Sequence, residues 1–113
     1  MRPYEVMIIL EANLDEEVIR GVIDRTVELV KQGEGEAGTV DRWGKRRFAY
    51  ELHHKWEGYY VIVSFNAPAT AIVEIDRFLS LADDVIRHKV MRLPDDHIEQ
   101  RKAAAGVQPV GAN

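Results

Sequence analysis

Residues 42–60 read RWGKRRFAYELHHKWEGYY, and this stretch decides the fold because its two halves have the character of paired strands. The two extended segments meet at residues 55–58, where we expect the hairpin turn. Five basic residues and six of the nine aromatic residues of the chain lie here. Cations contact phosphates, and flat rings stack on bases or on a partner's side chains. A binding surface is therefore expected on this hairpin.

Strand patterns continue on both sides of the hairpin turn. Residues 39–53 form its first strand, with a bulge or bend expected at Gly44, and residues 59–66 form its second. Residues 2–11 also alternate, but both of their faces are largely apolar in the middle, which predicts a central strand covered on one side and at least partly covered on the other. Residues 85–93 form the last strand.

Two amphipathic helices separate these strands. Asn13 or Asp15 caps the first helix, and Gly33 ends it. Pro68 opens the second. Apolar residues recur at three- and four-residue spacing in both, and this spacing predicts one buried stripe per helix. The stripes are Val18, Ile19, Val22, Ile23, Thr26, Leu29 and Val30 in the first helix and Ile72, Ile75, Phe78, Leu79 and Ala82 in the second.

The resulting order is strand, helix, strand, strand, helix, strand. This order predicts an α+β fold of the ferredoxin-like, split β-α-β type, with a four-stranded antiparallel sheet and two helices on one face. The other face of the sheet is left open. We expect one domain over residues 1–93, followed by a flexible C-terminal tail over residues 94–113, which is rich in small and polar residues.

Composition and charge narrow the function classes. The chain has 113 residues, no cysteine and a net charge of -4, and no apolar run approaches the roughly 20 residues of a membrane span. We therefore expect a cytoplasmic protein without disulfides or cysteine-bound metal. The charge is polarised: residues 42–55 hold five bases and one acid, whereas residues 15–37 hold seven acids and three bases. Local basic patches, not bulk charge, must serve any binding to nucleic acid.

Several motifs together resemble one known family. The block WGKRRFAYELHHKWEGYYV, the opening MRPYEVMII, the proline before the second helix and the final strand DDVIRHKVMR are similar to the bacterial small-ribosomal-subunit protein six family, over residues 1 to about 93. The resemblance implies a structural, non-enzymatic protein of the small ribosomal subunit. It also implies binding to the central domain of small-subunit ribosomal RNA together with a small basic partner, ribosomal protein eighteen. No cofactor, metal, small-molecule substrate or membrane is implied.

The resemblance also suggests binding residues. Its positions match Arg2, Tyr4, Arg46, Arg47, Tyr50 and Arg87, and three further cations near them are Lys55, Lys89 and Arg92. The arginines are expected to contact phosphates or sugars, and Tyr50 to pack against the partner or an RNA base. The hairpin sequence LHHKW and the strand RHKVMR depart from some relatives, so contacts there transfer less directly.

Simpler interpretations stand beside these expectations. Arg46 and Arg47 are adjacent on a strand and therefore point to opposite faces, and one of them could pair with Glu5, Glu11 or Glu51. The rings of Trp43 and Tyr59 are expected in the core, because aromatic side chains bury large areas.

Two other functions remain open from the sequence. One is a small ferredoxin-like dimeric enzyme or ligand-binding domain in which His53 or His88 meets a carboxylate in a cleft. The other is a repressor that binds messenger RNA through the same basic surface. Neither the spacing of the histidines nor the acidic pairs matches a zinc-protease or two-carboxylate motif.

Overall fold

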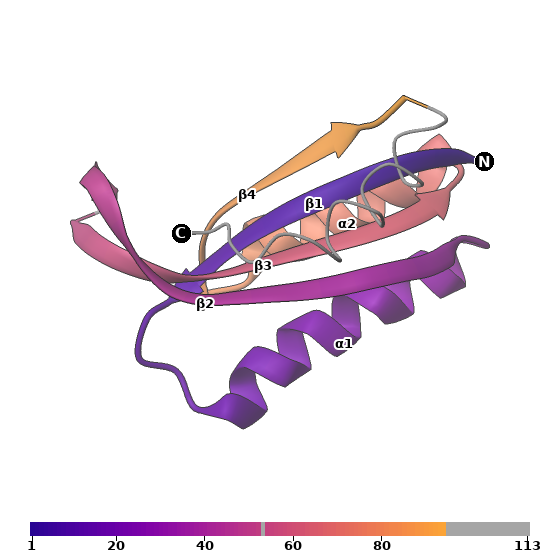
Figure 1. Ribbon diagram of the computed structural model, residues 1–113. Helices are drawn as coiled ribbons and strands as arrows, with labels where there is room; N and C mark the ends of the chain where they lie inside the picture. Colours follow the sequence, from indigo (N-terminus) through magenta and orange to yellow (C-terminus); the bar gives the residue numbers. More distant parts are fainter. Residues whose placement is uncertain (53, 95–113) are drawn as a thin grey trace.

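The computed structural model describes residues 1–52 and 54–94. Its elements are β1 (Arg2–Glu11), α1 (Glu16–Gln32), β2 (Glu36–Leu52), β3 (Lys55–Ala67), α2 (Ala69–Leu81) and β4 (Val85–Arg92). The strands form one antiparallel sheet in the order β2-β3-β1-β4, with α1 and α2 behind it (Figure 1). This arrangement confirms the expected ferredoxin-like fold. Residues 95–113, most of the expected tail, lie outside the described residues.

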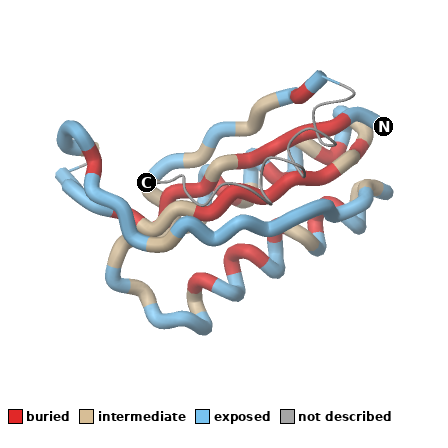
Figure 2. Tube along the Cα trace, in the orientation of Figure 1, coloured by how far each residue is buried: buried red, intermediate tan, exposed pale blue. Residues whose placement is uncertain are grey.

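The core lies between the helices and one face of β1 and β3. Alternate residues of β1, from Tyr4 to Leu10, face the helices, and Val61, Val63 and Phe65 of β3 lie beside them. Both central strands are buried along most of their length, whereas β2 is exposed along nearly all of it (Figure 2). The continuous apolar pattern of residues 2–11 therefore does mark a central strand.

Both helices present the stripes expected from their spacing. In α1 the buried residues are Ile19, Val22, Ile23, Thr26, Leu29 and Val30, and in α2 they are Ala71, Ile75 and Leu79. Asp15 is the N-cap of α1 and Gly33 its C-cap, and Pro68 precedes the first turn of α2. Of the remaining expected positions, Val18, Ile72, Phe78 and Ala82 are only partly buried.

The hairpin turn is earlier than expected. β2 ends at Leu52 and β3 already begins at Lys55, so residues 55–58 are strand, not turn. Gly58 had suggested a turn, but its role is close packing: a Cβ there would lie 2.6 Å from Ile9 Cγ2 and 2.9 Å from Phe48 Cζ. The bulge expected at Gly44 is present, because the register shifts between Arg42 and Gly44 and Gly44 has a φ of 85°.

The two strands of the hairpin continue beyond the rest of the sheet. β1 ends at Glu11, which pairs with Gly58, so among the described strands only β2 pairs with residues 55–57 of β3. We call residues 46–58 the hairpin arm, of which residue 53 is not described. Figure 1 shows the arm reaching past the end of β1 and away from the helices.

Candidate nucleic-acid and partner surface

The sheet face opposite the helices, which we call the open face, carries a row of aromatic rings. Trp43 of β2 stacks on Tyr60 of β3 with 6.4 Å between ring centroids and an interplanar angle of 17°. Phe48 meets the same tyrosine edge-on at 6.2 Å. Trp43 is 37% exposed, so the expectation that its ring lies in the core is wrong. Its Nε1 donates a hydrogen bond to Asp41 Oδ2 at 3.0 Å, and this contact between two residues of β2 restrains the indole.

Three of the candidate cations lie on this same open face. Paired residues of an antiparallel sheet share a face. Arg87 pairs with Ile9, which pairs with Tyr60, and Lys89 follows two residues further along β4. Arg46 of β2 pairs with Gly58, two residues from Tyr60 on the same face of β3. The register therefore places Arg46, Arg87 and Lys89 around the aromatic row.

The electrostatics of Tyr60 show how closely these groups lie. Burial raises the pKa of the Tyr60 hydroxyl, and Tyr50 raises it further. The positive charge of Arg87 acts on the same hydroxyl in the opposite direction. Residues of β2 and β4 therefore interact electrostatically with the Tyr60 hydroxyl of β3. In the part of the chain that the structure describes, Arg46, Arg87 and Lys89 form no ion pair, so their charges are available to a phosphate.

Arg42, at the base of the hairpin, is occupied by the protein itself. Its guanidinium donates two hydrogen bonds to Glu16, at 2.8 Å from Nη1 and 2.6 Å from Nη2, and one from Nε to the Tyr59 hydroxyl at 3.0 Å. The hydrogen bond from Arg42 lowers the pKa of the Glu16 carboxyl. This contact ties the exposed strand β2 to the start of α1. Arg42 is a structural clamp, and it was not among the expected binding residues.

The expected binding residues do not form one cluster. Arg46 and Arg47 lie on opposite faces, since Arg46 pairs with Gly58 and Arg47 with Glu57. Arg47 and Tyr50 are exposed on the hairpin arm, and Lys55 there forms an ion pair with Glu11 at 3.2 Å. Neither arginine pairs with a carboxylate among residues 1–52 and 54–94; the nearby Glu51 is paired with His54 at 3.3 Å instead.

The remaining candidates lie at the other end of the sheet. Arg92 pairs with Tyr4 in the register, and Arg2 with Ala67, and both arginines are exposed. Tyr4 is only 7% exposed, and its ring stacks on Phe65 in the core at 5.8 Å. Tyr4 therefore supports the fold, and its ring is not offered to a ligand.

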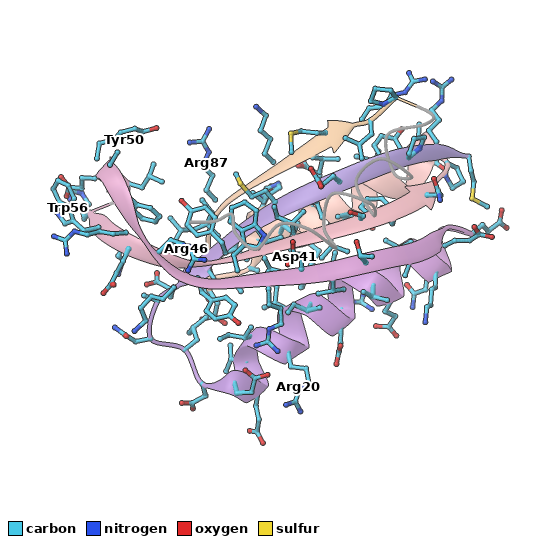
Figure 3. The ribbon with its side chains drawn as sticks, viewed as in Figure 1. Arg20, Asp41, Arg46, Tyr50, Trp56 and Arg87 are labelled. Carbon is cyan, nitrogen blue, oxygen red and sulfur yellow. The ribbon has the colours of Figure 1, made fainter. Side chains whose placement is uncertain are left out.

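Sequence reasoning named neither tryptophan as a binding residue. Trp56 is 52% and Tyr50 63% exposed, both near the free end of the hairpin arm (Figure 3). An aromatic residue within the expected turn was the available signal for Trp56. For Trp43 the register with Tyr60 was needed, because alternation through the bulge at Gly44 does not give its face.

Comparisons with known proteins agree on one family. The family model for ribosomal protein S6 matches residues 3–92. The chain belongs to the ribosomal protein S6 family. Small ribosomal subunit protein bS6 of Carboxydothermus hydrogenoformans is 49% identical over 92 residues, which cover 81% of this chain and 96% of that protein. The bS6 protein of Corynebacterium kroppenstedtii is 44% identical over 92 residues, covering 81% and 97%.

Solved structures give the same result. The crystal structure of ribosomal protein S6 from Thermotoga maritima matches with a TM-score of 0.79 at 30% identity, covering 90% of this chain and 96% of that one. The C-terminal domain of the MgtC protein from Mycobacterium tuberculosis matches with a TM-score of 0.60 at 11% identity, covering 82% and 88%. This second likeness shows the fold alone. It illustrates that the ferredoxin-like arrangement by itself does not identify a function.

Membership of the S6 family decides against the enzyme alternative left open by the sequence. The family consists of structural proteins of the small ribosomal subunit and not of enzymes, and the expected ribosome-associated, cytoplasmic location follows from it. Within the described ranges no helix is long and apolar enough to cross a bilayer.

The histidines of this S6 protein do not assemble a catalytic site where the structure describes them. His88 Nε2 lies 2.7 Å from Asp76 Oδ1 and links β4 to α2. His54 pairs with Glu51, while His53 and His97 lie outside the described residues. A hollow of about 560 Å³ lies along α1, and neither His54 nor His88 lines it. The family membership, and not the placement of these histidines, sets the enzyme alternative aside.

Proposed function

We propose that this small-subunit protein binds the central domain of small-subunit ribosomal RNA together with a small basic protein, ribosomal protein eighteen. The open face carries the proposal: Arg46, Arg87 and Lys89 surround the stacked rings of Trp43 and Tyr60. Cations beside flat rings suit phosphates next to unstacked bases. Membership of a ribosomal protein family supports RNA as the polyanion.

The charge distribution supports a shared site with a basic partner. The chain as a whole carries -4, which disfavours RNA binding by bulk electrostatics. Residues 15–37, which include α1, are strongly acidic, and they suit a positively charged neighbour. A complex of the two proteins brings the local cations of the open face to RNA without the repulsion of the acidic side.

Within this proposal the candidate residues have different roles. Arg46, Arg87 and Lys89 contact RNA from the open face. Arg47, Tyr50 and Lys55 contact RNA or the partner from the hairpin arm, and Arg2 and Arg92 do so at the opposite end of the sheet. Tyr4 is left out because its ring is buried.

The test removes two open-face cations. In the Arg46→Ala/Arg87→Ala variant, the complex with the basic partner should bind a central-domain RNA fragment more weakly. The slope of log affinity against log salt should fall by about 2, because each phosphate contact releases about one counterion. The melting temperature should stay within a few degrees, since neither side chain forms an ion pair in the described region.

A matched control carries the same change in charge on α1. Arg20 and Arg25 are exposed there and pair only with Glu16 and Glu28 of the same helix. Arg20→Ala/Arg25→Ala should leave the salt slope unchanged. An equal loss in both variants would mean that only net charge matters, and no loss in either would reject the open face as the RNA surface.

A further inference from the structure

We infer that the hairpin arm carries a stacking site for an unpaired RNA base, with the exposed ring of Trp56 as the platform and the exposed ring of Tyr50 as a second contact on the same arm. The inference rests on the proposed RNA binding and adds a site beyond the open face. Neither ring is needed by the core. Trp56 was not among the residues that the family resemblance suggested.

The exposure of the two rings is the first observation. Trp56 is 52% and Tyr50 63% exposed, whereas Phe65, in the sheet, is fully buried. An aromatic side chain buries roughly 150–250 Å² when it packs. Two such side chains left exposed on one short hairpin arm therefore mark an interaction surface. The end of β1 at Glu11 leaves the arm uncovered. Figure 3 shows Tyr50 and Trp56 at the free end of the arm, directed away from the helices.

The charges around the rings select the kind of partner. The hairpin arm, residues 46–58, holds three bases against two acids in a chain of net charge -4. On the arm itself, Arg47 forms no ion pair with any described residue, and the side chain of Lys55 remains 46% exposed although it pairs with Glu11. Arginines of the arm without an ion pair in the described ranges attract a polyanion. An exposed ring on the same arm as these arginines therefore suits a nucleotide, whose base and phosphate meet both.

The geometry of an RNA duplex excludes a paired base as the ligand of this site. The major groove of an RNA duplex is too deep and narrow for side chains to read, and bases inside a duplex are already stacked. Bases in loops, bulges and junctions expose a flat face that an indole can cover. Every base has such a face, so the site should tolerate changes of base identity.

The experiment uses the full chain in complex with the basic partner and a central-domain RNA fragment that contains unpaired nucleotides. Trp56→Leu should lower RNA affinity by roughly 5- to 150-fold, the loss of one stacked base. Trp56→Phe should retain most of the affinity, because a ring remains. The melting temperature reports whether the leucine variant folds, and Tyr50→Leu should show a smaller loss in the same assay.

Fluorescence gives an independent measurement. The chain has two tryptophans, so Trp43→Phe leaves Trp56 as the sole emitter. Stacking on a base should quench its emission as RNA is added and leave it unchanged as the partner protein alone is added.

Three outcomes overturn the inference in distinguishable ways. If Trp56→Leu binds RNA as tightly as wild type while Arg46→Ala/Arg87→Ala does not, the proposed function stands and the stacking site is wrong. If Trp56→Leu weakens binding to the partner in the absence of RNA and leaves RNA affinity intact, Trp56 contacts protein. Failure of the wild-type complex to bind the RNA would reject the proposed function and the stacking site together.

Discussion

β1 and β2 lie on the two sides of β3, and they are buried to opposite extents. β1 pairs with a strand on both edges and is covered by helices on one face, so all but its ends is buried or nearly so. β2 is an edge strand of 17 residues in which only Phe48 is buried. β1 therefore contributes most to the stability of the sheet. β2 provides a surface at which residues can be substituted without unfolding the protein.

The sharpest test of this contrast is a cavity in β1. Ile8→Ala removes a fully buried side chain from the core and should lower the free energy of unfolding by about 2–5 kcal/mol. Val40→Ala in β2 is the matched control, since Val40 is 40% exposed, and it should change stability by about 0.5 kcal/mol or less. Urea titration of both variants measures the difference. Equal losses would contradict the division between the two strands.

Gly58 marks the place where the buried and exposed parts of β3 meet. Gly58→Ala should destabilise the fold by about 1–3 kcal/mol, because the new Cβ would lie 2.6 Å from Ile9 Cγ2 and 3.1 Å from the backbone oxygen of Leu10. Thermal unfolding gives the measurement. Gly21→Ala is the control: nothing lies within 4 Å of its added Cβ in α1, and it should raise stability by about 0.5–1 kcal/mol.

The smallest effect is expected at the clamp between β2 and α1. Arg42→Met should lower stability slightly at neutral pH, because Glu16 loses the partner that lowers its pKa. A lowered carboxyl pKa stabilises the fold above the pKa of the unfolded chain, and this gain disappears as the pH falls through the folded value. The difference between wild type and Arg42→Met should therefore be constant near neutral pH and shrink as the pH falls below the unfolded carboxyl pKa of about 4.3. A difference independent of pH would show that the Tyr59 contact, and not Glu16, carries the effect.

The same contrast explains what the sequence allowed us to predict. β1, α1 and α2 were placed correctly because each buries one regular set of apolar residues, and a period of 2 or 3.6 appears directly in the chain. The strand ends were less accurate. Glu36 begins β2 three residues before the expected start because it pairs with Asn66, a partner 30 positions away. Gly58 was assigned to the turn because its packing against Ile9 and Phe48 depends on tertiary structure and is not visible in the sequence.

The site was predictable only in part. Alternation correctly placed Arg46 and Arg47 on opposite faces, and the basic and aromatic composition of residues 42–60 correctly marked the exposed region. The meeting of Arg46, Arg87 and Tyr60 depends on the pairing of three strands that are far apart in sequence. The bulge at Gly44 breaks simple alternation, so the stacked position of Trp43 required the register.

The strand order has a consequence for how the protein is made. β1 is synthesised before the other five described elements, yet it stands in the middle of the sheet, and its neighbours are residues 55–67 and 85–92. The hairpin of β2 and β3 closes locally, but one edge of β1 waits for the last strand of the domain. A nascent chain that stops after α2 leaves that edge unpaired, so the sheet is completed only when translation of the domain is nearly finished.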